Sequence, residues 1–75
     1  MNIYKVYLTA VGDINNNRTL IGKARTQKGV GRIIYRFKKK HGYQDCITRA
    51  WTHGEYIITD FGSWHWYLLT KKEVI

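Results

Sequence analysis

The sequence has no proline, a single cysteine and only five acidic residues. Because Cys46 cannot form an intramolecular disulfide, a disulfide-stabilised secreted domain is excluded and a reducing, cytoplasmic setting is expected. No segment approaches the roughly 18 consecutive apolar residues of a membrane-spanning helix, and residues 1–5 lack the basic start and apolar run of a signal peptide. We therefore expect a cytoplasmic protein of the host cell, with no membrane partner.

What is present is a short chain rich in apolar residues. Its 75 residues are 44% apolar and 15% aromatic, which is too apolar for intrinsic disorder. The length predicts a single domain over 1–75. A chain this short buries only about 60 to 65% of its unfolded surface, so a core shared through homodimerisation stays an alternative.

The charge is strongly unbalanced. Thirteen Lys and Arg residues give a net charge of +8 at pH 7. A positive field of this density attracts phosphate backbones and acidic surfaces. The sequence therefore predicts a polyanionic partner, with nucleic acid or a nucleoprotein as the leading candidate.

The first part of the chain has the pattern of a β-hairpin. Residues 3–11 alternate in character, with Tyr4 and Val6 on the same side, as in a half-buried strand. Residues 12–17 are rich in Gly, Asp and Asn, which favour a turn, and residues 18–25 form the expected return strand.

The apolar period then changes to that of an α-helix. Thr26 is placed to cap its start, and Gly42 supplies the left-handed residue that ends it. Gly29 and Gly31 each cost up to about 1 kcal/mol of helix propensity, so the first turns are expected to be short or frayed unless packing or a ligand backbone compensates. The apolar stripe consists of Val30, Ile33, Ile34, Phe37 and His41.

The last part of the chain reads as three further strands. Residues 45–52 and 55–61 form a predicted hairpin around His53 and Gly54, and residues 64–70 form the last strand. The expected fold is a single small α+β domain of order ββαβββ, with an antiparallel sheet packed on one α-helix. The other face of the sheet is expected to meet solvent or a partner.

The helix carries a basic stripe opposite its apolar stripe. The segment between Gln27 and Tyr43 contains no acidic residue, whereas an ordinary solvated helix intersperses Glu for pairing. Cations one turn apart can follow phosphates, and an exposed Tyr can stack on a base. The predicted contacts for nucleic acid or another partner are Lys28, Arg32, Tyr35, Arg36, Lys39 and Lys40.

The last strands supply a second set of candidates, because they hold more aromatic residues than one small core accepts. Solvent-facing aromatics with Arg between them would form a stacking platform for unpaired bases. Plain core packing, or the seam of a homodimer, would produce the same composition. The predicted contacts here are Arg49, Trp51, Trp64 and Trp66.

Catalysis is the alternative from another class. Two of the three histidines, His41, His53 and His65, could support a metal-free ribonuclease of toxin type with a nearby Lys or Arg. They lie on three different expected elements, and the spacing of acidic residues matches no metal site or Gly-rich phosphate loop. We therefore expect a non-enzymatic protein with no catalytic residues, no cofactor and no metal.

The order ββα followed by a terminal β-hairpin, the net charge of +8 and the closing segment Thr70-Lys71-Lys72-Glu73-Val74-Ile75 resemble small phage-encoded anti-CRISPR proteins directed at Cas9-type effectors. The resemblance implies an inhibitor that occupies a functional surface of the effector or interferes with its guide RNA or target DNA. That family shares no active-site motif, so no catalytic residue is implied. Under this reading the natural contacts are Arg32, Arg36, Lys39, Trp64 and Trp66.

Overall fold

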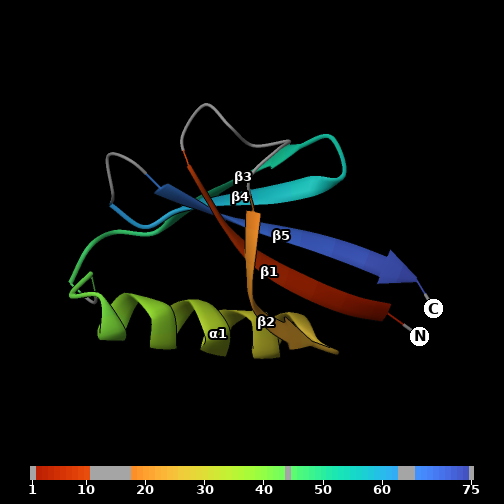
Figure 1. Ribbon diagram of the computed structural model, residues 1–75, viewed down its shortest axis with the longest axis horizontal. Coiled ribbons are helices and arrows are strands. Elements are labelled where there is room, and N and C mark those ends of the chain that lie inside the picture. Colours follow the sequence, from red (N-terminus) through yellow and green to blue (C-terminus); the bar gives the residue numbers. More distant parts are fainter. Residues whose placement is uncertain (1, 11–17, 44, 63–65, 75) are drawn as a thin grey trace.

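The computed structural model of the chain describes residues 2–10, 18–43, 45–62 and 66–74. It confirms the predicted α+β fold and the order ββαβββ, with one helix and a five-stranded antiparallel sheet (Figure 1). The elements are β1 (Asn2–Ala10), β2 (Arg18–Ala24), α1 (Gln27–Lys40), β3 (Arg49–His53), β4 (Tyr56–Asp60) and β5 (Trp66–Val74).

The sheet has the strand order β2-β1-β5-β4-β3. Its centre is the pairing of β1 with β5, which runs from Asn2 opposite Val74 to Ala10 opposite Trp66. Both ends of the described chain therefore lie at the same edge of the molecule (Figure 1). The outer strands β2 and β3 are the two free edges of the sheet.

The helix covers one face of the sheet, mainly over β2 and β1. The centre of the core is formed by Val6, Phe61 and Leu68, each no more than 1% exposed. Alternation along β1 and β5 places Val6 and Leu68 on the helix side, as the sequence pattern predicted for Val6, and Phe61 directly follows β4. Around them pack Leu8, Ile21, Val30, Ile33, Ile34, Phe37 and Tyr43.

The helix is not shortened at its start, because α1 begins at Gln27 directly after the cap residue Thr26. The Thr26 hydroxyl caps α1 by accepting a hydrogen bond from the backbone N–H of Gly29 at 3.1 Å. Packing explains Gly29, because a Cβ at this position would lie 2.8 Å from the Cβ of Ala24. Gly31 is different: a Cβ there would meet no atom within 4 Å.

The end of the helix also fixes where β3 begins. Gly42 has φ of 80°, and the N–H of Tyr43 donates to the carbonyl of Lys38 at 2.7 Å, which satisfies the last turn as predicted for a glycine stop. The Lys38 Nζ donates to the Cys46 carbonyl at 2.8 Å and to the Thr48 hydroxyl at 2.6 Å. Because these contacts hold residues 46–48 against α1, the strand starts at Arg49 and not at residue 45.

The last strand extends beyond its predicted end. β5 runs to Val74, four residues past Thr70, because its Lys-rich end stays paired with β1. Lys71 and Glu73 lie on one face of the sheet and Thr70 and Lys72 on the other, which is the alternation of a strand. The predicted strand ended at Thr70, although this alternation continues beyond it. Trp64, at the predicted start, lies outside the described residues.

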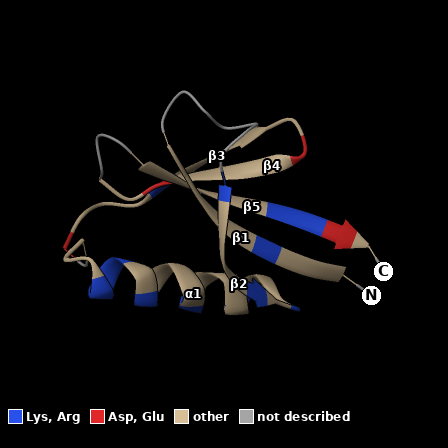
Figure 2. Ribbon diagram, viewed as in Figure 1, with Lys and Arg blue, Asp and Glu red and all other residues tan. Residues whose placement is uncertain are grey.

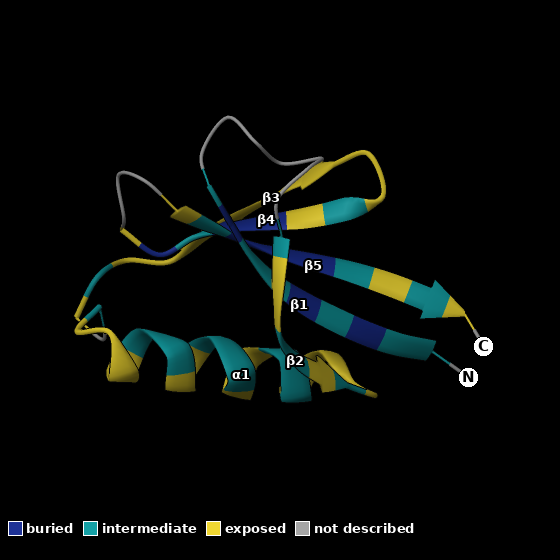
Figure 3. Cartoon of the chain, viewed as in Figure 1, coloured by how far each residue is buried: buried dark blue, intermediate teal, exposed yellow. Residues whose placement is uncertain are grey.

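The sheet face opposite α1, here called the far sheet face, was expected to meet solvent or a partner, and part of it is buried within the chain itself. By alternation along β4 and β5, Ile58 and Leu69 point to this face, and they are 1% and 0% exposed. Figure 3 shows that both strands carry buried segments. Trp51 and Tyr67 form an edge-to-face pair on the same face, with ring centroids 5.6 Å apart. Aromatic side chains therefore build a second, small apolar cluster there.

Candidate nucleic-acid interface

The outer side of α1 carries the densest positive charge in the described chain. Five cations, Lys28, Arg32, Arg36, Lys39 and Lys40, are exposed on α1, and we call this set the helix basic face (Figure 2). Tyr35 lies among them and is 60% exposed. The structure thus confirms the exposure predicted for these side chains, while their role as contacts stays a prediction.

The helix basic face is not neutralised by neighbouring carboxylates. Within the described residues the ion pairs join Glu73 with Lys5, at 3.0 Å, and with Lys71, at 3.9 Å, and none involves α1. The last turn holds Lys38, Lys39 and Lys40, where cations also stabilise the helix dipole. The charge is therefore free to meet an external anion.

The C-terminal half of α1 borders a hollow of about 380 Å³ that includes Arg36, Lys40 and His41. A second hollow begins at Phe37 and His41 and reaches Trp66. Trp66 is 44% exposed. By alternation along β5 it lies on the same side as the buried Leu68, which is the helix side of the sheet. Of the aromatic contacts predicted on the last strands, Trp66 is the one among the described residues that lies near the C-terminal end of the helix basic face.

The other predicted contacts lie elsewhere. Arg49 and Trp51 are exposed on β3 and point to the far sheet face, where Trp51 packs against Tyr67. The sheet therefore separates them from the helix basic face, and the predicted set divides into two surfaces. Trp64 lies outside the described residues.

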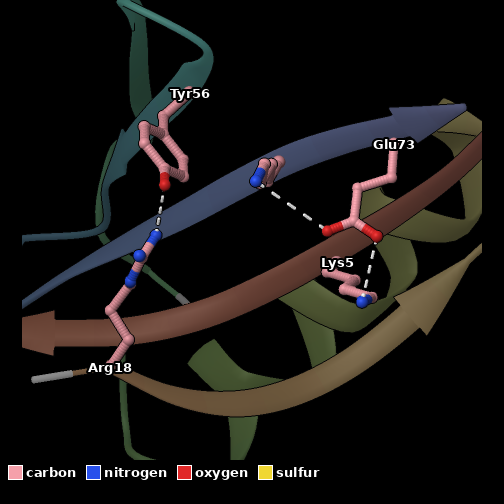
Figure 4. A network of polar contacts seen from close by, with 5 residues as sticks. Lys5, Arg18, Tyr56 and Glu73 are labelled. Carbon is pink, nitrogen blue, oxygen red and sulfur yellow. Dashed lines mark hydrogen bonds and ion pairs between the residues drawn. The ribbon is translucent and has the colours of Figure 1, made fainter. Parts of the chain in front are cut away.

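A contact that the sequence reading missed spans the far sheet face. The Arg18 Nη1 donates a hydrogen bond to the Tyr56 hydroxyl at 2.5 Å, and its guanidinium lies 5.0 Å from the Tyr56 ring centroid (Figure 4). It also lies 5.4 Å from the centroid of Tyr7. Alternation along β1 predicts that Tyr7 lies on this face. The contact between Arg18 on β2 and Tyr56 on β4 could not be predicted in this way, because it depends on the order of the strands in the sheet.

The lysines at the other end of this face share one carboxylate. The hydrogen bond and charge of Glu73 raise the pKa of Lys5, and the hydrogen bond from Lys5 lowers the pKa of Glu73 against a smaller opposing effect of desolvation (Figure 4). The pair contributes to stability at pH values between these two pKa values. Its contribution is lost as the pH falls through the pKa of Glu73 or rises through that of Lys5.

The histidines do not form a common site in the described chain. His41 follows α1 and packs against the Phe37 ring, whereas His53 ends β3 on the other side of the core. His65 lies outside the described residues. Among the residues that the structure describes, no group of three or more His, Cys, Asp or Glu side chains could hold a metal ion.

Comparison with known proteins adds no relatives: no family model, curated protein or solved structure matches this chain. The helix of the described chain is too short and too polar to cross a membrane. The functional argument therefore depends on the surface itself.

Proposed function

We propose that the chain is a small, non-enzymatic binding protein that contacts nucleic acid or a nucleoprotein through the helix basic face. The observation that supports this is the set of five exposed cations on α1 without an acidic partner in the described chain. A helix that served only as the solvated cover of a sheet would gain stability from interspersed carboxylates. Uncompensated charge along one element is the electrostatic footprint of a phosphate backbone.

The geometry suits contact with successive phosphates. Lys28, Arg32 and Arg36 stand four residues apart, which places each about 6 Å further along the helix axis than the one before. Such contacts fix the position of a backbone and carry no sequence information. Tyr35 beside them, and Trp66 at the C-terminal end, are placed to stack on an unpaired base.

The sharpest form of the proposal is inhibition of a Cas9-type effector, which the resemblance noted above supports. A chain with a net charge of +8 cannot imitate DNA in a basic channel. It would bind the guide RNA or heteroduplex backbone that the effector displays, or an acidic patch on the effector. In either form the helix basic face is the contact surface.

The test is a titration of tryptophan fluorescence with single-stranded and duplex oligonucleotides, and with a guide-loaded Cas9-type effector, at low and high salt. For oligonucleotide, the double variant Arg32→Glu/Arg36→Glu should weaken binding at least about tenfold and lower the slope of log affinity against log salt by about 2. The matched control is Lys23→Glu/Lys72→Glu, which changes the net charge equally at two exposed lysines that are not part of the helix basic face.

Equal losses in the two double variants would show that only net charge matters, and the helix basic face would be rejected as the site. A response to the loaded effector alone, tolerant of salt, would place the contact on a nucleoprotein surface. If neither oligonucleotide nor effector binds, the proposed function fails.

A further inference from the structure

A groove runs along the flank of α1 that faces β4 and β3, and Tyr35 borders it on the side of the helix basic face. It consists of three adjoining hollows of about 270 to 300 Å³. The first two share Gln27 and Thr70, and the last two share Gly31 and Ile34. The groove follows α1 from Gln27 to Lys38, a length of about 16 Å. We call it the flank groove.

The groove exists because one helix covers only part of a five-stranded sheet. α1 packs mainly over β2 and β1, whereas β4 and β3 extend beyond it on the same face (Figure 1). Ile57, on the floor, is 41% exposed, and all five residues of β3, including Ala50 in the groove, are exposed. An apolar sheet surface beside a helix is the place where a two-layer α+β domain accepts a second helix.

Gly31 forms the wall of the groove and has no internal explanation. Glycine within a helix costs stability, and the close approach of Ala24 accounts for Gly29 but not for Gly31. A Cβ at Gly31 would meet open space. The absence of a side chain here leaves room for a neighbouring backbone to approach α1, as close helix pairs require.

Thr70 gives a second, independent indication of a ligand. Its side chain is 4% exposed and lies in the floor of the groove, and its hydroxyl has no hydrogen-bond partner in the described chain. A buried hydroxyl without a partner is costly, and a polar group inserted into the groove would supply the missing bond.

The charged residues that border the groove indicate which kind of partner it can bind. Lys38 borders one end and keeps one ammonium N–H beyond its bonds to residues 46 and 48, and Lys72 borders the other end with Glu55 beside it. A second copy of this chain would bring another charge of +8 to the same place and is disfavoured. A strand added to the free edge of β3 would lie beyond β4 and could not reach Thr70 on β5.

We propose that the flank groove binds an acidic amphipathic helix of a partner protein, which lies beside α1 on the exposed part of the sheet. Its apolar stripe covers Ala50 and Ile57, its backbone approaches Gly31, and one polar side chain in the stripe bonds the Thr70 hydroxyl. Carboxylates on its flanks face Lys38 and Lys72. This surface is separate from the helix basic face, so the inference does not depend on the nucleic-acid proposal.

The probe is a synthetic helical peptide of about 14 residues, with Leu and one Gln on its apolar side and Glu on both flanks, titrated into the ¹⁵N-labelled protein. The amide signals of Gly31, Ala50, Ile57 and Thr70 should shift together. The same peptide with Lys in place of Glu should bind at least about tenfold more weakly.

Two variants test the location. Gly31→Leu fills the wall of the groove where nothing is displaced, and Ile57→Asn replaces the apolar side chain on its floor with a neutral polar one. Each should weaken the acidic peptide about tenfold or more while oligonucleotide binding to the helix basic face is unchanged. Because Gly31 is in open space, Gly31→Leu should fold, which amide spectra of the free variant will show.

Three results would overturn the inference. Peptide shifts confined to Lys28, Arg32 and Arg36, unaffected by Gly31→Leu, would mean that acidic peptide merely coats the helix basic face. Shifts confined to β3 would indicate strand addition at the edge. Groove shifts that appear without peptide as protein concentration rises would make a second copy the occupant.

Discussion

At the scale of single residues, Thr70 allows the clearest test of packing. Its hydroxyl is buried on the helix side of β5, without a partner among the described residues. The methyl group of a valine would fit the same shape without the cost of the unpaired hydroxyl. We predict that Thr70→Val raises the free energy of unfolding by about 1 kcal/mol, measured by urea denaturation.

Thr9 is the matched control for this prediction. It is 0% exposed on the neighbouring strand β1, but its side chain or backbone takes part in a further polar interaction. Thr9→Val should therefore leave stability unchanged or lower it. A loss of stability in Thr70→Val would mean that the hydroxyl already has a partner, such as an ordered water, in solution.

Residue exposure on α1 could be predicted from sequence, whereas side-chain partnerships could not. The period of 3.6 residues places Arg32 and Arg36 opposite Ile33 and Ile34 without any knowledge of the fold. The contact of Arg18 with Tyr56 depends on the strand order β2-β1-β5-β4, which no local pattern encodes. The division of Trp51 and Trp66 between two faces likewise follows from registers set by distant strands.

At the scale of elements, the two helical glycines of α1 should respond in opposite directions to the same substitution. Gly31→Ala should raise the free energy of unfolding by about 0.5 to 1 kcal/mol, because alanine favours the helix and meets no neighbour. Gly29→Ala should lower it, because the new Cβ would lie 2.8 Å from the Cβ of Ala24. Thermal or urea unfolding followed by circular dichroism measures both.

The two variants serve as controls for each other, because Gly→Ala changes the helix propensity by about the same amount in both. Only the atoms that the new Cβ would meet differ. Equal gains in stability would show that α1 shifts away from Ala24 at no cost, so Gly29 would not be explained by packing. Equal losses would mean that Gly31 is enclosed in solution.

The boundaries of elements were predictable where local chemistry decides them. Thr26 and Gly42 begin and end α1 as expected, because caps are local hydrogen-bonding arrangements. The start of β3 was not predictable, since Lys38 holds residues 46–48 through contacts across the fold. The end of β5 extends past Thr70 for a related reason: a charged strand is stable where a partner strand pairs with it.

At the scale of the whole molecule, the composition and the topology together predict the folding kinetics. The central β1–β5 pairing joins residues that are far apart in sequence, so folding should take milliseconds to seconds. The chain has no proline, so the phase of about 10 to 100 s that proline isomerisation causes should be absent. Stopped-flow refolding from urea should therefore give a single exponential.

Addition of a prolyl isomerase is the control and should change nothing. A refolding phase of tens of seconds would contradict the prediction and point to an off-pathway species or to association of two chains.

The position of β5 in the sheet also has a consequence for synthesis on the ribosome. β1 with β2 and α1 forms one half of the molecule, β3 with β4 forms the other, and β5 is the strand that pairs with both halves. β5 leaves the ribosome after β1, β2, α1, β3 and β4, about 3 to 13 s later than β1 at ordinary rates of elongation. During that interval Val6 and Leu8 lie at an unpaired strand edge. The nascent chain thus holds two half-sheets that β5 unites, and loss of residues 66–74 would separate the halves instead of merely shortening the fold.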